Sequence, residues 1–88
     1  MQKDNKIKLL IIEDNEIDRQ LCRRHLSDEL YEIHEAITGM QGITMYKDLH
    51  PDCVLLDHQL PDITGLDLLQ ELHEEELVLP VIIVTGFG

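Results

Sequence analysis

Acidic side chains follow two apolar segments of this chain, and a threonine follows another. Glu13 and Asp14 come directly after one apolar run. Asp57 follows a second run and Thr85 follows a third. If these runs are neighbouring parallel strands, their carboxyl ends meet at one edge of a sheet. That edge then gathers three carboxylates and a hydroxyl, a set suited to holding a divalent cation beside a reactive carboxylate.

Three adjacent carboxylates repel one another, so without a counter-charge at least one of them would have a raised pKa. A divalent cation removes this conflict, and ligands that are all hard oxygens favour Mg²⁺ or Mn²⁺ over Zn²⁺. With such a cation in place, the Asp57 carboxylate could attack the phosphorus of an incoming phosphoryl group. Thr85 would donate its hydroxyl to a phosphoryl oxygen, and Gly86 would leave room for that oxygen.

Helix capping is the alternative interpretation of these acids. Asp14 would cap a helix even in a protein without a site. Asp57 is different, because no helix is expected to begin before Thr64. Capping therefore does not explain Asp57, while both interpretations of Asp14 stay open at this point.

Four strands can be predicted from the apolar patterns. Continuous apolar runs indicate strands that are buried on both faces, and a strictly alternating run indicates a strand with one polar face. The continuous runs are residues 8–13, 53–56 and 81–84, and the alternating run is residues 31–36.

A helical pattern with an N-terminal cap fills each interval between the strands. Asp14 or Asn15 can cap the first helix, in which Leu21 and His25 fall on an apolar face. Thr38 opens the second helix and Thr64 the third, each in a capping-box pattern. The order βαβαβαβ requires an α/β fold with a parallel sheet and right-handed crossovers.

Composition limits the classes of partner. The chain has 88 residues with 7 Lys and Arg against 18 Asp and Glu, a net charge of −11. This charge repels nucleic acids and anionic membrane surfaces, so we expect neither as a partner. No apolar run is long enough for a signal peptide or a membrane span, so we expect a cytoplasmic location. Cys22 and Cys53 lack metal-site or redox spacing, and we expect both to be reduced packing residues.

Three segments carry a family resemblance: IIEDNEIDRQL, PDCVLLDHQLPDITGLDLL and LPVIIVTGFG. Together they resemble the receiver domain of two-component response regulators, and EDNEID is similar to receivers fused to hybrid sensor kinases. The resemblance covers nearly the whole chain and implies a flavodoxin-like receiver fold. Its expected form is one domain over residues 1–88, C-terminally incomplete, with a parallel sheet in the order 2-1-3-4 and three helices.

The resemblance also implies roles for the acidic residues. Asp57 matches the aspartate that accepts the phosphoryl group. Glu13 and Asp14 match the acidic pair that holds Mg²⁺. The main-chain carbonyl of Gln59 is implied as a further metal ligand beside Asp57.

Other positions match the family at the phosphoryl group and in the structural frame. Thr85 matches the switch hydroxyl, and Gly86 lies beside it at the phosphoryl-binding position. The structural positions implied in the loop after Asp57 and at the helix starts are Pro61, Gly65 and Gly39.

The chain departs from the family pattern in three places. Glu13 stands where many members have Asp, and Leu60 where many have Met. The sequence ends two residues after Gly86, before the fifth strand that brings a phosphoryl-binding lysine in the family. Lys8 lies at the start of a strand and so at the other edge of the sheet. We therefore expect slower or less persistent phosphorylation than in a complete receiver.

The implied function is a phospho-accepting signalling module of a two-component phosphorelay. Its donor would be a histidine kinase or a phosphotransfer protein, and the chain would not be an enzyme beyond its own phosphorylation. The alternative is a truncated receiver or pseudo-receiver that acts as a dimerisation or docking module without phosphotransfer. A hydrolase that forms an aspartyl phosphate is disfavoured, because no DxDxT motif follows Asp57.

Self-association is the last expectation from the sequence. A sheet that stopped at the fourth strand would leave residues 81–84 as an unprotected apolar edge. It would also bare aliphatic surface from LLII and CVLL. We therefore expect a homo-oligomer, such as a dimer, through the fourth strand and the uncovered sheet face.

Overall fold

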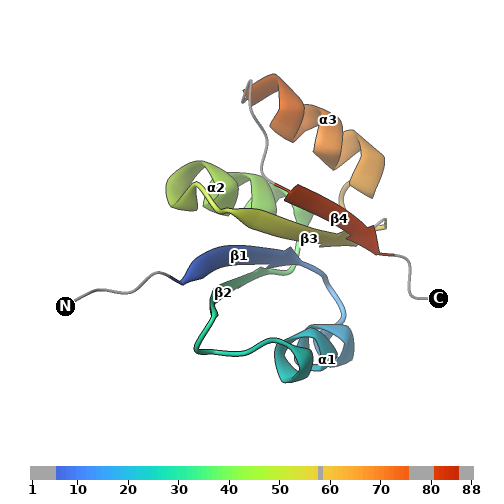
Figure 1. Cartoon of the computed structure of the whole chain (residues 1–88). Helices are drawn as coiled ribbons and strands as arrows, with labels where there is room; N and C mark the ends of the chain where they lie inside the picture. The colour runs from blue at the N-terminus through green and yellow to red at the C-terminus, as the bar shows by residue number, and fades with distance from the viewer. Residues whose placement is uncertain (1–5, 58, 76–80, 86–88) are drawn as a thin grey trace.

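A computed structural model describes residues 6–57, 59–75 and 81–85 of the chain. Within them, four parallel strands form one sheet in the order β2-β1-β3-β4 (Figure 1). The strands are β1 (Ile7–Ile12), β2 (Tyr31–Ala36), β3 (Cys53–Asp57) and β4 (Val81–Thr85). The helices are α1 (Glu16–His25), α2 (Gly39–Leu49) and α3 (Gly65–Glu75). None of these three helices is long and apolar enough to cross a membrane.

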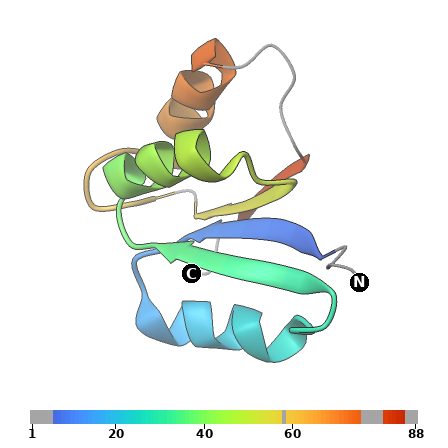
Figure 2. The ribbon, with the colours of Figure 1, turned by 90° about the vertical axis from the view of Figure 1, so that its left-hand side faces the viewer.

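The predicted element order, the parallel sheet and the strand order are confirmed. α1 lies on one face of the sheet, and α2 and α3 lie on the other (Figure 2). Strand boundaries agree with the sequence patterns to within one residue. All four strands therefore end at the same edge, which is where the candidate site residues were expected.

The main core lies between the sheet and the pair α2 and α3. Leu10 and Ile12 of β1 and Leu56 of β3 are fully buried there, against Leu68 and Leu72 of α3. Leu9 and Ile11, which alternate with these residues along β1, are buried as well, on the face toward α1. A strand that is buried on both faces explains the unbroken apolar run in the sequence. This core fixes the carboxyl ends of β1 and β3 side by side.

The three predicted helix caps are present, and Asn15 rather than Asp14 caps α1. The Asn15 side chain accepts a hydrogen bond from the Asp18 amide at 2.9 Å and caps α1. Thr38 caps α2 through the Gln41 amide at 3.1 Å, and Thr64 caps α3 in the same way. Because Asn15 is the cap of α1, the side chain of Asp14 is not needed for capping.

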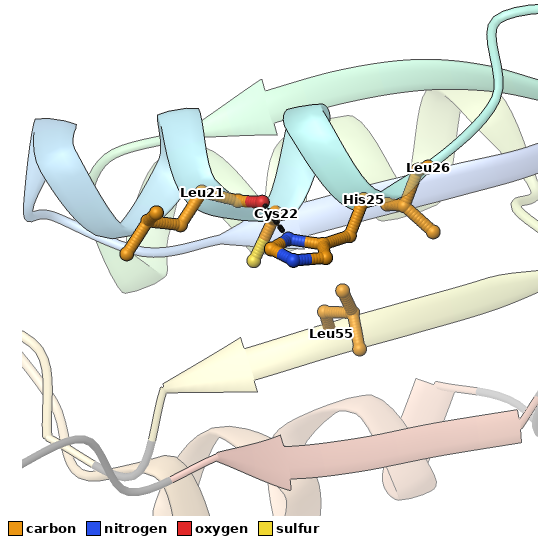
Figure 3. A pocket seen from close by; sticks show the side chains of 5 residues that line it. All are labelled: Leu21, Cys22, His25, Leu26 and Leu55. Atoms are coloured by element: carbon orange, nitrogen blue, oxygen red, sulfur yellow. Dashed lines mark hydrogen bonds between the residues drawn. The ribbon is translucent and has the colours of Figure 1, made fainter.

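The apolar face of α1 packs less tightly than its sequence suggests. No residue of α1 is buried, and Leu21 is 41% exposed. With Leu55 of β3, this face borders an open apolar groove of about 360 Å³ (Figure 3). The lining residues are Leu21, Cys22, His25, Leu26 and Leu55. The predicted shared face is therefore correct, but no described residue covers it on the β3 side.

Candidate functional site

Three carboxylates meet at the carboxyl edge of the sheet. Glu13 and Asp14 directly follow β1, and Asp57 is the last residue of β3. One carboxylate oxygen from each lies within 4.8 Å of the other two. Glu13 is buried, Asp57 is half-buried and Asp14 is exposed. The cluster predicted from the sequence is thus formed, and it opens to solvent on the Asp14 side.

Glu13 is held by both its main chain and its side chain. Its amide donates to the Ala36 carbonyl at 2.9 Å, which extends the pairing of β1 with β2 beyond the strand end. Its Oε2 accepts a hydrogen bond from the Asn15 amide at 3.2 Å. Glu13 as a whole residue is only 5% exposed, so its side chain cannot turn into solvent without a rearrangement of this turn.

The environment of Glu13 raises its pKa from the ordinary 4.5 to about 7. Burial is the largest cause, since it disfavours the charged form. The Asn15 amide opposes the rise, whereas the charge of Asp57 and a hydrogen bond with its carboxyl add to it. The rise expected from the sequence is therefore confirmed, although burial contributes more than the repulsion between carboxylates.

An arginine network supports the Glu13 turn from the α1 side. Arg19 donates from Nη1 to the Glu13 carbonyl at 2.8 Å and from Nε to Glu35 at 3.0 Å. Arg23 reaches the second oxygen of Glu35 at 2.6 Å. The network links α1, the end of β1 and β2. Sequence analysis missed it, because nothing in the spacing of these residues along the chain brings them together before α1 packs on the sheet.

The donor set of this site fits a small hard cation. Ligand oxygens of an octahedral Mg²⁺ site lie about 3 to 4 Å apart, because each is about 2.1 Å from the metal. The 4.8 Å limit of the present cluster requires only a small contraction to reach that geometry. A cation would also replace the proton that the metal-free site favours on Glu13. Glu13, Asp14 and Asp57 are therefore suited to hold Mg²⁺.

The neighbouring strand places Thr85 beside Asp57. The register of β3 against β4 pairs these two residues directly. Gly86 lies outside the described residues. Gln59 follows β3 closely and forms an isolated antiparallel bridge with Thr64. The backbone at Thr85 and at Gln59 thus approaches the acidic cluster from the β4 side and from the loop after β3.

The predicted structural positions lie around the loop between β3 and α3. Gly65 is the first residue of α3 and is buried, whereas Pro61 is exposed within the loop. Gly39 is the first residue of α2 and is buried against this loop. A Cβ atom at position 39 would overlap Ile63 Cγ2 and lie 3.1 Å from Asp62 Oδ1. The close approach of the loop to α2 therefore requires glycine there.

Lys8 lies at the opposite edge of the sheet, as expected. Its Nζ donates to the Leu49 carbonyl at the end of α2 at 3.1 Å. Its amide donates to the Asp52 carboxylate at 2.9 Å. This lysine is engaged far from the acidic cluster and does not serve it.

Comparisons with known proteins agree with this geometry. The family model of the response regulator receiver domain matches residues 9–88. The polar-differentiation response regulator DivK of Brucella ovis is 35% identical over 82 residues, which cover 91% of this chain and 67% of that protein.

Solved structures share the fold. The signal receiver domain of a putative LuxO repressor protein from Vibrio parahaemolyticus superposes with a TM-score of 0.84 at 26% identity, over 92% of this chain. The CheX-CheY complex of Borrelia burgdorferi with beryllofluoride and Mg²⁺ gives a TM-score of 0.82 at 22% identity, over 91% of this chain and 61% of that chain. At 22% identity this second likeness concerns the fold alone. The present chain spans 62% of the length of the Vibrio domain. With the acidic cluster at the carboxyl edge of a 2-1-3-4 sheet, these matches show that the chain belongs to the response regulator receiver domain family.

Proposed function

We propose that this chain accepts a phosphoryl group on Asp57, within a two-component phosphorelay. The donor would be the phosphohistidine of a histidine kinase or of a phosphotransfer protein. Glu13, Asp14 and Asp57, with the main-chain carbonyl of Gln59, would hold Mg²⁺ or Mn²⁺. The chain supplies the acceptor carboxylate and the metal ligands, and it acts as a signalling module and not as an enzyme on other substrates.

The chemistry follows from the residues at the carboxyl edge. An oxygen of the Asp57 carboxylate attacks phosphorus, a P–O bond forms, and the P–N bond to the donor histidine breaks with its electron pair leaving on the imidazole. A cation held by Glu13, Asp14 and Asp57 would supply positive charge that offsets the charge on the transferring oxygens. Thr85 is proposed to donate its hydroxyl to a phosphoryl oxygen, and Gly86 to leave space beside it.

The observation that carries this proposal is the convergence of Glu13, Asp14 and Asp57 within 4.8 Å. A docking module without phosphotransfer would gain nothing from burying Glu13 beside Asp57, because burial of a carboxyl without a counter-ion is unfavourable. Asn15 caps α1 in place of Asp14, which removes the capping explanation. Phosphotransfer is therefore favoured over the docking alternative.

Self-association through the fourth strand and an open sheet face is retained as a proposal. The apolar groove between α1 and Leu55 supports it, because contiguous exposed apolar surface favours association. Sedimentation velocity at micromolar concentration tests it. A dimer is expected, and a stable monomer would contradict it. The cytoplasmic location expected from the sequence likewise stays a prediction.

Phosphorylation can be tested with a small-molecule donor. The chain is incubated with acetyl phosphate and Mg²⁺, and its intact mass is measured. We expect one added phosphoryl group that hydroxylamine removes, that EDTA prevents and that Asp57→Ala abolishes. Asp28→Ala, a change of an exposed acid at the opposite edge, is the matched control. A folded wild-type protein that gains no phosphoryl group would refute the proposal and support the docking alternative.

A further inference from the structure

The loop between β3 and α3 is fastened to the start of α2 by one side chain. Asp62 Oδ1 accepts a hydrogen bond from the Gly39 amide at 2.8 Å, and Oδ2 accepts one from the Met40 amide at 2.9 Å. These are the first two amides of α2, which have no partner within the helix. Both amides hold the pKa of Asp62 below its ordinary value. The carboxylate thus joins two segments that are more than twenty residues apart in sequence.

The loop itself is a closed turn, so holding its tip also holds its base. Gln59 and Thr64 form a bridge at the base, and the Leu60 amide donates to the Ile63 carbonyl at 3.1 Å. The Leu60 side chain is buried in the core. Asp62 lies between Leu60 and Ile63, at the tip. Its contact with α2 therefore restricts the backbone back to Gln59.

The fit of the loop to α2 is an independent sign that this contact is specific. Ile63 packs on the core cluster beside α2. As described above, any side chain at position 39 would overlap Ile63, so the interface is built around a glycine. Thr38 separately caps the next amide of the helix through its own side chain. Thr38 therefore leaves the Gly39 and Met40 amides to an acceptor from outside the helix, and the loop supplies it through Asp62.

We propose that Asp62 is a positioning residue for the metal site, which it serves by fixing residues 59–64 against α2. This inference rests on the proposed function, in which the Gln59 carbonyl is a metal ligand. Mg²⁺ demands near-ideal octahedral geometry, so a ligand on a loosened loop binds it less tightly. Residues that orient metal ligands typically change metal affinity by about 10 to 100-fold when they are removed.

Magnesium titration of folded variants tests the inference. By calorimetry, Asp62→Ala is expected to weaken Mg²⁺ binding about tenfold relative to wild type. Asp62→Asn keeps one acceptor oxygen, so its Mg²⁺ affinity should lie between those of Asp62→Ala and wild type. Asp28→Asn removes the same charge from an exposed site at the opposite edge and controls for the loss of negative charge. Circular dichroism shows whether each variant is folded.

A second measurement uses the wild-type chain alone. Because coupling between two sites is reciprocal, Mg²⁺ should slow hydrogen exchange of the Gly39 and Met40 amides, whose acceptor is Asp62. Because bound Mg²⁺ also stabilises the whole fold, the reference is the Gln41 amide, which Thr38 caps; a purely structural role for Asp62 would slow exchange at Gly39 and Met40 no more than at Gln41. The exchange measurement stays decisive even if the Asp62 variants do not fold.

Two results would overturn the inference while leaving the proposed function intact. One is a folded Asp62→Ala variant that binds Mg²⁺ as tightly as Asp28→Asn does. The other is exchange at Gly39 and Met40 that Mg²⁺ slows no more than at Gln41 in the wild-type protein. A wild-type chain that binds no Mg²⁺ at millimolar concentration would overturn both the inference and the proposed metal site.

Discussion

The substitution Glu13→Gln should stabilise the metal-free protein at alkaline pH. Glu13 has a folded-state pKa of about 7 against an ordinary value of 4.5. Since one pKa unit corresponds to about 1.4 kcal/mol, the ionised side chain costs the folded state at most about 3.5 kcal/mol. Glutamine is uncharged, its carbonyl can accept the Asn15 amide, and its NH₂ group can donate to Asp57. The variant should therefore escape most of this cost.

The pH dependence has a definite sign. Between pH 4.5 and about 7, the folded state keeps a proton on Glu13 that the unfolded state has released. Stability of the wild type in EDTA should thus fall as pH rises through this window and then level off, as far as Glu13 determines it. The gain from Glu13→Gln should be near zero at pH 4 and reach about 1 to 3 kcal/mol at pH 8.

Urea unfolding at a series of pH values in EDTA measures this difference. Glu29→Gln, a change of an exposed glutamate in the loop before β2, is the matched control and should show no such trend. Added Mg²⁺ should reverse the order at pH 8, because only the wild type has the third carboxylate. A gain that does not grow with pH, or a Glu29→Gln variant with the same trend, would refute the assignment of the raised pKa to Glu13.

Three further predictions concern the surroundings of the site. Asp14→Ala should abolish Mg²⁺ binding in calorimetry while leaving the unfolding free energy in EDTA unchanged or higher; unaltered Mg²⁺ affinity would contradict the proposed ligand set. Arg19→Ala should lower the unfolding free energy by about 1 to 3 kcal/mol in urea titrations, because Glu35 and a main-chain carbonyl lose a charged partner. An Arg19→Ala variant as stable as wild type would show the network to be unimportant. Gly39→Ala should lower the unfolding free energy by about 1 to 3 kcal/mol, because the added methyl group overlaps Ile63. An unchanged urea midpoint would show that the loop moves freely.

The fold was predictable because local patterns agree with the tertiary structure throughout. Unbroken apolar runs gave β1, β3 and β4, and capping residues such as Thr38 gave the helix starts. The carboxyl-edge rule then brought Asp57 to Glu13 without any knowledge of their contact. These features depend on residues close in sequence or on the topology of a parallel sheet, and both can be inferred from the sequence.

The supporting contacts could not be predicted in this way. Asp62 meets Gly39 only when the loop after β3 closes over α2, and its exposed position in a turn suggested no partner. Arg19 reaches Glu35 only when α1 packs on the sheet. The degree of burial of Glu13 also depends on that packing, which is why burial rather than charge repulsion turned out to be the larger cause of its raised pKa.

The most direct test of the central claim is a crystal structure of the chain grown with Mg²⁺ and beryllofluoride, a mimic of a phosphoryl group. We expect beryllofluoride on the Asp57 carboxylate and Mg²⁺ on Glu13, Asp14 and Asp57, with the Gln59 carbonyl as a further ligand. Beryllofluoride absent from Asp57 in a structure that contains Mg²⁺, or Mg²⁺ bound away from these carboxylates, would contradict the account.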